Sequence, residues 1–211
     1  MPGGYRKKVL LGGTLQGRAL VEPRDTVIRE EDLNPDFLEE LSELVEPVFE
    51  EEEVLSVQAC YQCGTCTGSC PSGRRTSYRT RLIMRKLQLG LVDEVIKSDE
   101  LWMCTTCYTC YERCPRGVKI VDAVKAARNL AAKKGYMAKA HRMVAMFVIK
   151  TGHAVPINDE IREVRKNIGL DEVPPTTHRY EEALEEVQKL VKINEFDKLI
   201  GYDWEEGDLV D

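Results

Sequence analysis

Eight cysteines lie in two runs of one spacing, C-x2-C-x2-C-x3-C-P, and the chain has no others. A [4Fe–4S] cluster is held by four cysteine thiolates, and a chain that carries this run twice is typical of proteins with two such clusters. The sequence therefore predicts two [4Fe–4S] clusters as cofactors and the transfer of one electron at a time. The first run is Cys60, Cys63, Cys66 and Cys70 with Pro71, and the second is Cys104, Cys107, Cys110 and Cys114 with Pro115.

The fourth cysteine of each run is expected to bind the cluster of the other run, as it does where this spacing is paired. This crossing would join the two runs, so cluster binding and folding should be coupled. The prolines lack a backbone N–H and should end each loop. The predicted ligands are Cys60, Cys63, Cys66 and Cys114 for the first cluster, and Cys104, Cys107, Cys110 and Cys70 for the second.

Other uses of the cysteines fit the sequence less well. Structural zinc takes four tetrahedral ligands, usually as two separated pairs, which is a different spacing. A disulfide framework needs an oxidising compartment, and residues 1–8 contain no apolar core of a signal peptide. A purely structural or sensing role for the clusters stays open, although two coupled clusters exceed what either role needs.

No residue pattern for substrate chemistry is present, so no catalytic residue is predicted. His141, His153 and His178 lie away from the cysteines in sequence, and we expect none of them to be a ligand. The protein should set the cluster potentials through burial, local charge and hydrogen bonds to sulfur. Arg113 and Arg116 flank Cys114 and should raise the potential of the nearer cluster. Tyr108 and Tyr111 in the second run, or Trp102 just before it, could shield a cluster from water.

The charged residues are unevenly distributed along the chain. Residues 71–150 contain 17 Lys or Arg and 6 Asp or Glu, whereas the two flanks together contain 13 basic and 30 acidic residues. The basic segment is either a solvated face or a docking face for partners. Nucleic acid is not an expected partner because no recognition motif occurs. The longest apolar run, 143–149, is far too short to span a membrane, so a cytoplasmic protein is expected.

The apolar periodicity predicts a mainly α-helical protein. The acidic run 50–53 is expected to be a solvated loop or a helix end. We divide the chain into an N-terminal arm (1–33, short and extended), a helical domain with two [4Fe–4S] loops (34–150), and a helical extension with an acidic tail (151–211). Tyr202 and Trp204 suggest that the tail docks onto a partner, unless it is a loose terminus. Predicted helices cover 35–45 after Asn34, the segment from a Thr76 or Ser77 cap to Gly90, 91–97, 119–134, 137–150, the segment from Asn158 to Gly169, and one capped by Thr177.

The local strings CYQCGTCTGSCP (60–71) and CTTCYTC (104–110) resemble the C subunit of the heterodisulfide reductases of methanogenic archaea. The resemblance covers residues 50–150 and includes the alpha-helical ferredoxin domain of that family. It implies an electron-transfer subunit of an oxidoreductase complex that functions in methanogenesis. Such a subunit relays electrons from the flavin-bearing A subunit to the CCG-repeat B subunit, which is the catalytic one and reduces the coenzyme M–coenzyme B heterodisulfide.

The same resemblance implies further features of the assembly. In the cytoplasmic complexes of this family, heterodisulfide reduction is coupled to ferredoxin reduction by electron bifurcation. A hydrogenase or formate dehydrogenase can belong to the same assembly as the electron donor. This chain has no adjacent cysteine pair, so it lacks the catalytic CCG element and would only carry electrons.

Three alternatives remain at this point. An iron–sulfur subunit of a succinate or fumarate enzyme would also carry a C-x4-C-x2-C site, which is absent. Iron–sulfur subunits for glycerol-3-phosphate or lactate oxidation usually carry CCG repeats, also absent. A non-catalytic, cluster-bearing interaction module would need a DNA-binding or signalling element, and the sequence contains none that we can identify.

Overall fold

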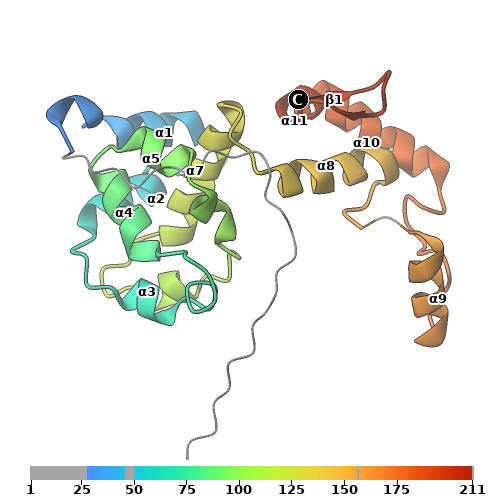
Figure 1. The fold of residues 1–211 in the computed structure, drawn as a ribbon, viewed down its shortest axis with the longest axis horizontal. Helices are drawn as coiled ribbons and strands as arrows, with labels where there is room; N and C mark the ends of the chain where they lie inside the picture. The colour runs from blue at the N-terminus through green and yellow to red at the C-terminus, as the bar shows by residue number, and fades with distance from the viewer. Residues whose placement is uncertain (1–27, 46–49, 156, 211) are drawn as a thin grey trace, which may run out of the picture. The chain divides into compact units, whose positions relative to one another are not determined.

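The computed structural model describes residues 28–45, 50–155 and 157–210, and over these residues the protein is mainly helical, as predicted (Figure 1). Most of the predicted N-terminal arm lies outside the described residues. Within its described part, Glu30–Asp32 forms a short 3₁₀ helix. The two clusters of apolar side chains described below belong to residues 31–210.

The first apolar cluster is built around α7 (Ile120–Lys133), which packs against α1, α2, α4, α5 and α6. Ala123, Ala126 and Ala127 on this helix are fully buried, and their small side chains let the neighbouring helices approach closely. The largest buried side chains around it include Phe37, Tyr78 and Met84. The other helices of this part are α1 (Phe37–Val45), α2 (Glu51–Leu55), α3 (Thr65–Ser69), α4 (Thr80–Gln88), α5 (Val92–Ile96) and α6 (Thr109–Glu112), with 3₁₀ turns at Ser56–Ala59 and Asp99–Met103.

The start of α1 is held against the turn between α4 and α5. The Asn34 N–H donates to the carbonyl of Gly90 at 3.0 Å, and Gly90 has a positive φ of 65°. A Cβ atom on Gly90 would lie 1.7 Å from the Asn34 carbonyl oxygen, so only glycine fits this contact. The Asn34 side chain accepts from the Asp36 N–H, consistent with the predicted helix start.

Two of the predicted helix caps are wrong. Thr76 accepts from the Tyr78 N–H within a turn, and α4 begins later, at Thr80. The Thr177 hydroxyl donates to the Thr151 carbonyl at 2.9 Å, and α10 begins at Glu181. In both places a tertiary or turn contact takes the hydroxyl that the sequence pattern assigned to a cap.

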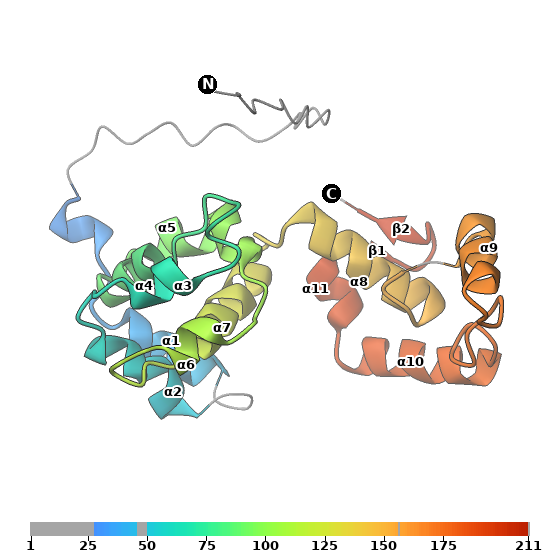
Figure 2. The ribbon, with the colours of Figure 1, turned by 90° about the horizontal axis from the view of Figure 1, so that it is seen from below.

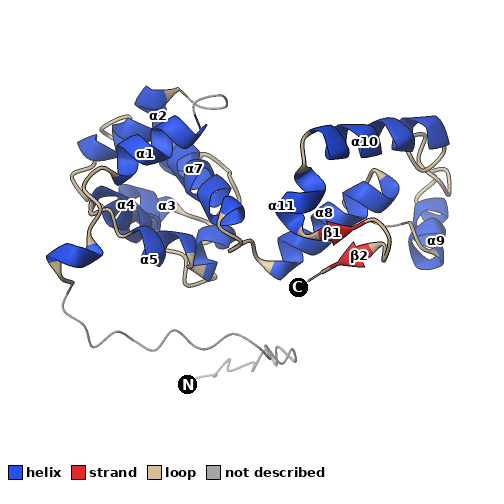
Figure 3. Ribbon diagram, turned by 90° about the horizontal axis from the view of Figure 1, so that it is seen from above, coloured by secondary structure: helices blue, strands red, loops and turns tan. Residues whose placement is uncertain are grey.

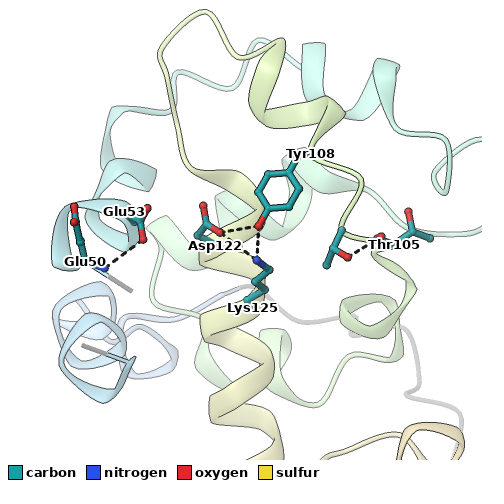
Figure 4. A network of polar contacts seen from close by, with 7 residues as sticks. Glu50, Glu53, Thr105, Tyr108, Asp122 and Lys125 are labelled. Carbon is teal, nitrogen blue, oxygen red and sulfur yellow. Dashed lines mark hydrogen bonds and ion pairs between the residues drawn. The ribbon is translucent and has the colours of Figure 1, made fainter. Parts of the chain in front are cut away.

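Two other caps fit the sequence pattern. The Asn158 side chain accepts from the Ile161 N–H at the start of α9, as predicted. The acidic run starts α2, where the Glu50 N–H donates to the Glu53 carboxylate at 3.2 Å (Figure 4). An acidic first turn also favours helix formation because it complements the helix dipole.

The second apolar cluster lies in the C-terminal part of the chain and contains Ile149, Val191 and Ile200. Helix α8 packs against α10 and α11 here, so its buried side belongs with the extension. The division after residue 150 stays a prediction, and this packing favours a boundary before α8. The elements are α8 (Lys139–Thr151), α9 (Asp159–Asn167), α10 (Glu181–Ile193), α11 (Phe196–Ile200) and an antiparallel ribbon of β1 (Tyr202–Asp203) and β2 (Asp208–Leu209), drawn red in Figure 3.

The tail packs on its own chain, so the alternative of a loose terminus is wrong, and docking of its aromatics onto a partner stays a prediction. The Trp204 indole N–H donates to the Asp197 carboxylate at 2.6 Å, and the Lys192 ammonium lies 4.1 Å from the indole centroid. Arg142 on α8 donates to the carbonyls of Ile200 and Val210, which fastens both ends of the ribbon. The ribbon itself was not predicted, because its strands are only two residues long.

Candidate iron–sulfur centres

The two cysteine loops lie side by side because the short helices α3 and α6, one in each loop, pack against each other (Figure 2). No cysteine forms a disulfide. The second cysteine of each run, Cys63 or Cys107, is exposed, whereas the third, Cys66 or Cys110, is buried. The helices therefore place corresponding thiols of the two runs in similar surroundings.

The two loops also share an unusual backbone conformation. In the first loop Gln62 and Gly64 have positive φ values of 65° and 84°. At the corresponding positions of the second loop, Thr106 and Tyr108 have φ values of 51° and 60°. A short helix starts directly after each pair. Sequence reasoning missed this feature, since only one of the four positions is a glycine.

A threonine contacts the exposed thiol in both loops. Cys63 Sγ lies 3.4 Å from the Thr65 hydroxyl, and Cys107 Sγ lies 3.5 Å from the Thr109 hydroxyl. These hydroxyl contacts lower the pKa of both thiols, because a donor stabilises the thiolate. The thiolate is the form that binds metal.

The buried thiols behave differently. Burial raises the pKa of Cys66, and burial together with neighbouring Cys104, Cys66 and Cys107 raises the pKa of Cys110 to about 12. The Cys66 and Cys110 sulfurs thus interact electrostatically across the two runs. Several thiols gathered around buried sulfurs favour a cationic partner such as iron, which neutralises their thiolates.

A cavity brings together four of the predicted ligands. It is lined by Cys104, Cys107 and Cys110 of the second run and by Cys70 of the first. These are the four residues predicted for the second cluster. The ligand assignment itself stays a prediction, and the cavity shows that the fourth cysteine of one run lies among the first three of the other.

Cys114 correspondingly lies beside the first run. The pKa of Tyr61 is raised by desolvation, by its charge and hydrogen-bond interactions with Cys63, and by the charge of Cys114. Helix α6, which ends two residues before Cys114, packs against α3 of the first run, in agreement with this interaction. This neighbourhood is what the predicted ligand set of the first cluster requires.

Two buried hydroxyl groups line the cavity of the second run. Thr80 Oγ1 is fully buried and has no hydrogen-bond partner among the described residues. Burial, followed by the charge of Cys104 and a hydrogen bond to it, raises the pKa of Tyr78, which keeps its hydroxyl protonated. Two O–H donors beside four thiols suit an anionic, sulfur-rich group, so the residues present fit a [4Fe–4S] cluster.

Each loop is supported at its start by one side chain that binds two backbone carbonyls. Gln88 on α4 donates to the carbonyls of Val57 at 3.1 Å and Cys60 at 2.8 Å. Arg128 on α7 donates to the corresponding carbonyls of Leu101 at 3.0 Å and Cys104 at 2.6 Å. A neutral amide and a charged guanidinium therefore perform the same structural task. Neither residue was singled out from the sequence.

Tyrosines and lysines cover the second loop. The Tyr108 hydroxyl contacts the Asp122 carboxylate at 3.4 Å and the Lys125 ammonium, and Lys125 lies 3.5 Å from the same carboxylate (Figure 4). Lys119 donates to the Tyr111 hydroxyl and also lies over the ring. The bulkier side chains predicted to shield this loop are thus held in place by cations.

Arginines surround the first loop. The Arg81 guanidinium lies 3.4 Å from the Gln62 carbonyl, and the Arg113 guanidinium lies 3.4 Å from the Ser69 hydroxyl. The positive charge of Arg116 lowers the pKa of Tyr61, against the larger effects that raise it. All three arginines are exposed, and Tyr61 is 60 % exposed.

Trp102 and the three histidines pack against other side chains of the protein. Trp102 packs against the first apolar cluster, with its ring centroid 4.9 Å from that of His141 and the Arg128 guanidinium 5.7 Å away. His153 and His178 face each other in the extension at 4.7 Å. No three His, Cys, Asp or Glu side chains in the described ranges are grouped so that they could hold a single metal ion. Within the same ranges, no helix has the length and apolarity needed to cross a membrane.

Comparison with protein families identifies a 4Fe–4S dicluster domain over residues 56–118, which includes both cysteine runs. This match agrees with the prediction of two [4Fe–4S] clusters.

Similar proteins cover most of the chain. One is the C subunit of the H2:CoB–CoM heterodisulfide,ferredoxin reductase of Methanothermobacter thermautotrophicus, 57% identical over 90% of this chain and 98% of its own length. Another is the iron-sulfur C 2 subunit of the CoB–CoM heterodisulfide reductase of Methanocaldococcus jannaschii, 56% identical over 87% of this chain and 98% of its own. The C subunit of the Ferredoxin:CoB–CoM heterodisulfide reductase of Methanosarcina mazei is 50% identical over 69% of this chain and 89% of its own.

Proposed function

Because the chain belongs to the C-subunit family of heterodisulfide reductases, an iron–sulfur component of an oxidoreductase complex, we propose that it relays single electrons through two [4Fe–4S] clusters. The observation that carries the proposal is the cavity in which Cys70 lies among Cys104, Cys107 and Cys110. Four thiols from two separate runs that line one cavity are suited to a multi-iron cluster.

The two ligand sets are those that the spacing predicts. Cys60, Cys63, Cys66 and Cys114 hold the first cluster, and Cys104, Cys107, Cys110 and Cys70 hold the second. When bound, each cluster supplies one reversible one-electron step. The chain itself orients the thiols and places hydroxyl donors beside the second set. Its lysines and arginines balance the negative charge of the thiolates.

The partners follow from the family. Electrons would arrive from the flavin-bearing A subunit and leave to the CCG-repeat B subunit, where the coenzyme M–coenzyme B heterodisulfide is reduced. Two of the relatives carry names that state H2, or H2 and formate, as electron sources. A hydrogenase or formate dehydrogenase is therefore the proposed donor to the assembly. We place the complex in the cytoplasm of a methanogen, where it couples heterodisulfide reduction to ferredoxin reduction.

Anaerobic native purification tests this function. The isolated chain should contain about eight iron and eight sulfide per polypeptide, and its reduced form should show the electron paramagnetic resonance spectrum of two interacting [4Fe–4S] clusters. Mass spectrometry of the purified assembly should identify two further proteins, one with CCG repeats and a larger one that bears flavin. Four irons, zinc in place of iron, or a membrane cytochrome as the partner would each contradict the proposal.

A further inference from the structure

The first cluster loop has an exposed centre. Cys63 and Tyr61 both reach solvent, and Tyr61 is 60 % exposed. The second loop has its own exposed thiol, Cys107, but there Tyr108 is held by Lys125 and Asp122. The first loop is therefore the more open of the two toward an approaching protein.

The exposed centre is surrounded by three arginines that come from two separate parts of the chain. Arg81 reaches the loop at Gln62, and Arg113 reaches it at Ser69. Arg116 follows Cys114 by two residues and is exposed. We define these three arginines with Tyr61 and Cys63 as the arginine surface.

None of these arginines forms an ion pair with a carboxylate of the described residues, whereas elsewhere Lys97, Arg179 and Lys198 do. Arginine presents a flat, weakly hydrated fork of donors that matches a carboxylate. Three such groups that have no acidic partner among the described residues, near an exposed sulfur, create a positive field that attracts an acidic surface.

We propose that the arginine surface is the docking site for an acidic electron-transfer protein, and that electrons pass between that partner and the first cluster. This inference rests on the proposed function, since it assumes that the first cysteine set holds a cluster. One electron leaves the reduced cluster and reduces the redox group of the partner, or passes in the opposite direction. The contact need only be small, because interfaces of redox partners commonly bury less than about 1,200 Å².

The test uses the cluster-loaded protein and two probe proteins, an acidic one-iron rubredoxin and a basic cytochrome c. The protein is reduced, and its oxidation by each probe is followed by stopped flow at several ionic strengths. In each reaction one electron converts one ferric iron of the probe to ferrous iron. The variant combines Arg81→Gln, Arg113→Gln and Arg116→Gln. A control combines Lys134→Gln, Arg162→Gln and Lys189→Gln, which removes the same charge from exposed positions outside the surface.

For the acidic probe we expect the wild-type rate to fall steeply with salt, and the variant to react about tenfold more slowly at low ionic strength. The control should change less than twofold, and cytochrome c should not be slowed by the variant. Equal slowing by the control, or an unchanged rate in the variant, would overturn the docking site. Iron content and the paramagnetic resonance spectrum are measured first, so loss of a cluster is distinguished from loss of docking.

A second measurement identifies the partner within the native complex. Arg113→Lys keeps the charge and adds an amine that a zero-length carbodiimide can join to a carboxylate. In the purified assembly we expect this lysine to be joined to an Asp or Glu of another subunit. Joining to a second copy of this chain, for which the exposed acidic residues of α10 are candidates, would overturn the proposal, as would free reactivity of the lysine inside the complex.

Discussion

The two cysteine loops have the same backbone conformation but are supported by different side chains. Both have a left-handed position on either side of the second cysteine, and both have the carbonyl of their first cysteine bound by a side chain from a helix. That side chain is the neutral Gln88 in the first loop and the charged Arg128 in the second. Different residues therefore control the geometry of the ligands and the electrostatic setting of each loop.

The charges near the two loops predict which cluster has the higher reduction potential. Arg128 is partly buried between Trp102 and the second loop, so solvent screens its charge less than that of the exposed arginines at the first loop. Thr80 adds a buried hydroxyl on the same side. A positive charge and hydrogen-bond donors stabilise the more negative, reduced form of a cluster. We therefore expect the second cluster to have the higher reduction potential.

The largest effect should come from removing the cysteine that each run is predicted to contribute to the cluster of the other run. Cys70→Ala should remove the cluster bound by Cys104, Cys107 and Cys110, although Cys70 belongs to the other run. The iron content should fall by about half, because one of two four-iron groups is lost. Iron analysis and paramagnetic resonance of the variant measure this outcome.

A matched variant is needed to assign the paramagnetic resonance signal that is lost in Cys70→Ala to one of the two clusters. Cys114→Ala should remove the first cluster and leave the one that Cys70→Ala removes. If each variant instead loses the cluster of its own run, the crossing of ligands is wrong.

The next effect concerns the charge difference between the supports. Arg128→Gln gives the second loop the side chain that supports the first, so the potential of the second cluster should become more negative while that of the first changes little. A redox titration followed by paramagnetic resonance measures both. Arg162→Gln, on α9 in the extension, is the control. Equal shifts of the two clusters in Arg128→Gln would contradict a local role for this charge.

A smaller effect tests the shared backbone. Gly64 has a φ of 84°, and Gly64→Ala should destabilise the first loop by about 1 kcal/mol, since an L-residue is strained there. Gly68→Ala is the control, because Gly68 lies within α3 and has open space where its Cβ would be. Thermal loss of the visible cluster absorbance should be faster in the first variant only. Equal rates in the two variants would mean that the left-handed position carries no strain.

The smallest effect should come from changing Tyr108, which covers the second loop. Tyr108→Phe removes the hydroxyl that contacts Asp122 and Lys125, which should cost about 1 kcal/mol or less because the ion pair between them remains. The second cluster should then be lost somewhat faster in air, as measured by absorbance. Tyr180→Phe, at an exposed position, should have no effect. Faster loss of the first cluster instead would show that Tyr108 does not protect its own loop.

The two clusters and most helices could be predicted from the sequence, because cysteine spacing and apolar periodicity are local signals. The resemblance to the C subunit of heterodisulfide reductases and the mainly helical fold are confirmed. The helix starts at Thr76 and Thr177 were wrong because a turn and a distant carbonyl take those hydroxyls. Propensity for a cap cannot reveal a competing tertiary partner.

Gln88 and Arg128 escaped prediction for a similar reason. Each is an ordinary polar residue of a helix, and its role depends on a carbonyl group 24 to 31 residues away in sequence. Thr80 gave no signal either, since only the fold shows that its hydroxyl is buried without a partner among the described residues. The packing of the aromatic tail on its own chain was not predicted either, because its acidic sequence gives no sign of the contacts that Arg142 and Asp197 provide.

The closeness of Cys66 and Cys110 has a consequence for the order of electron movement. Helices α3 and α6, which carry these two cysteines, pack against each other, so the two anionic clusters would lie next to each other across the paired loops. An electron that occupies one group repels a second electron from the other, and the repulsion is strong because both sulfurs are buried. The second electron should therefore enter at a more negative potential than the first, so that electrons pass mainly one by one and a two-electron reduction downstream is assembled from two separate deliveries.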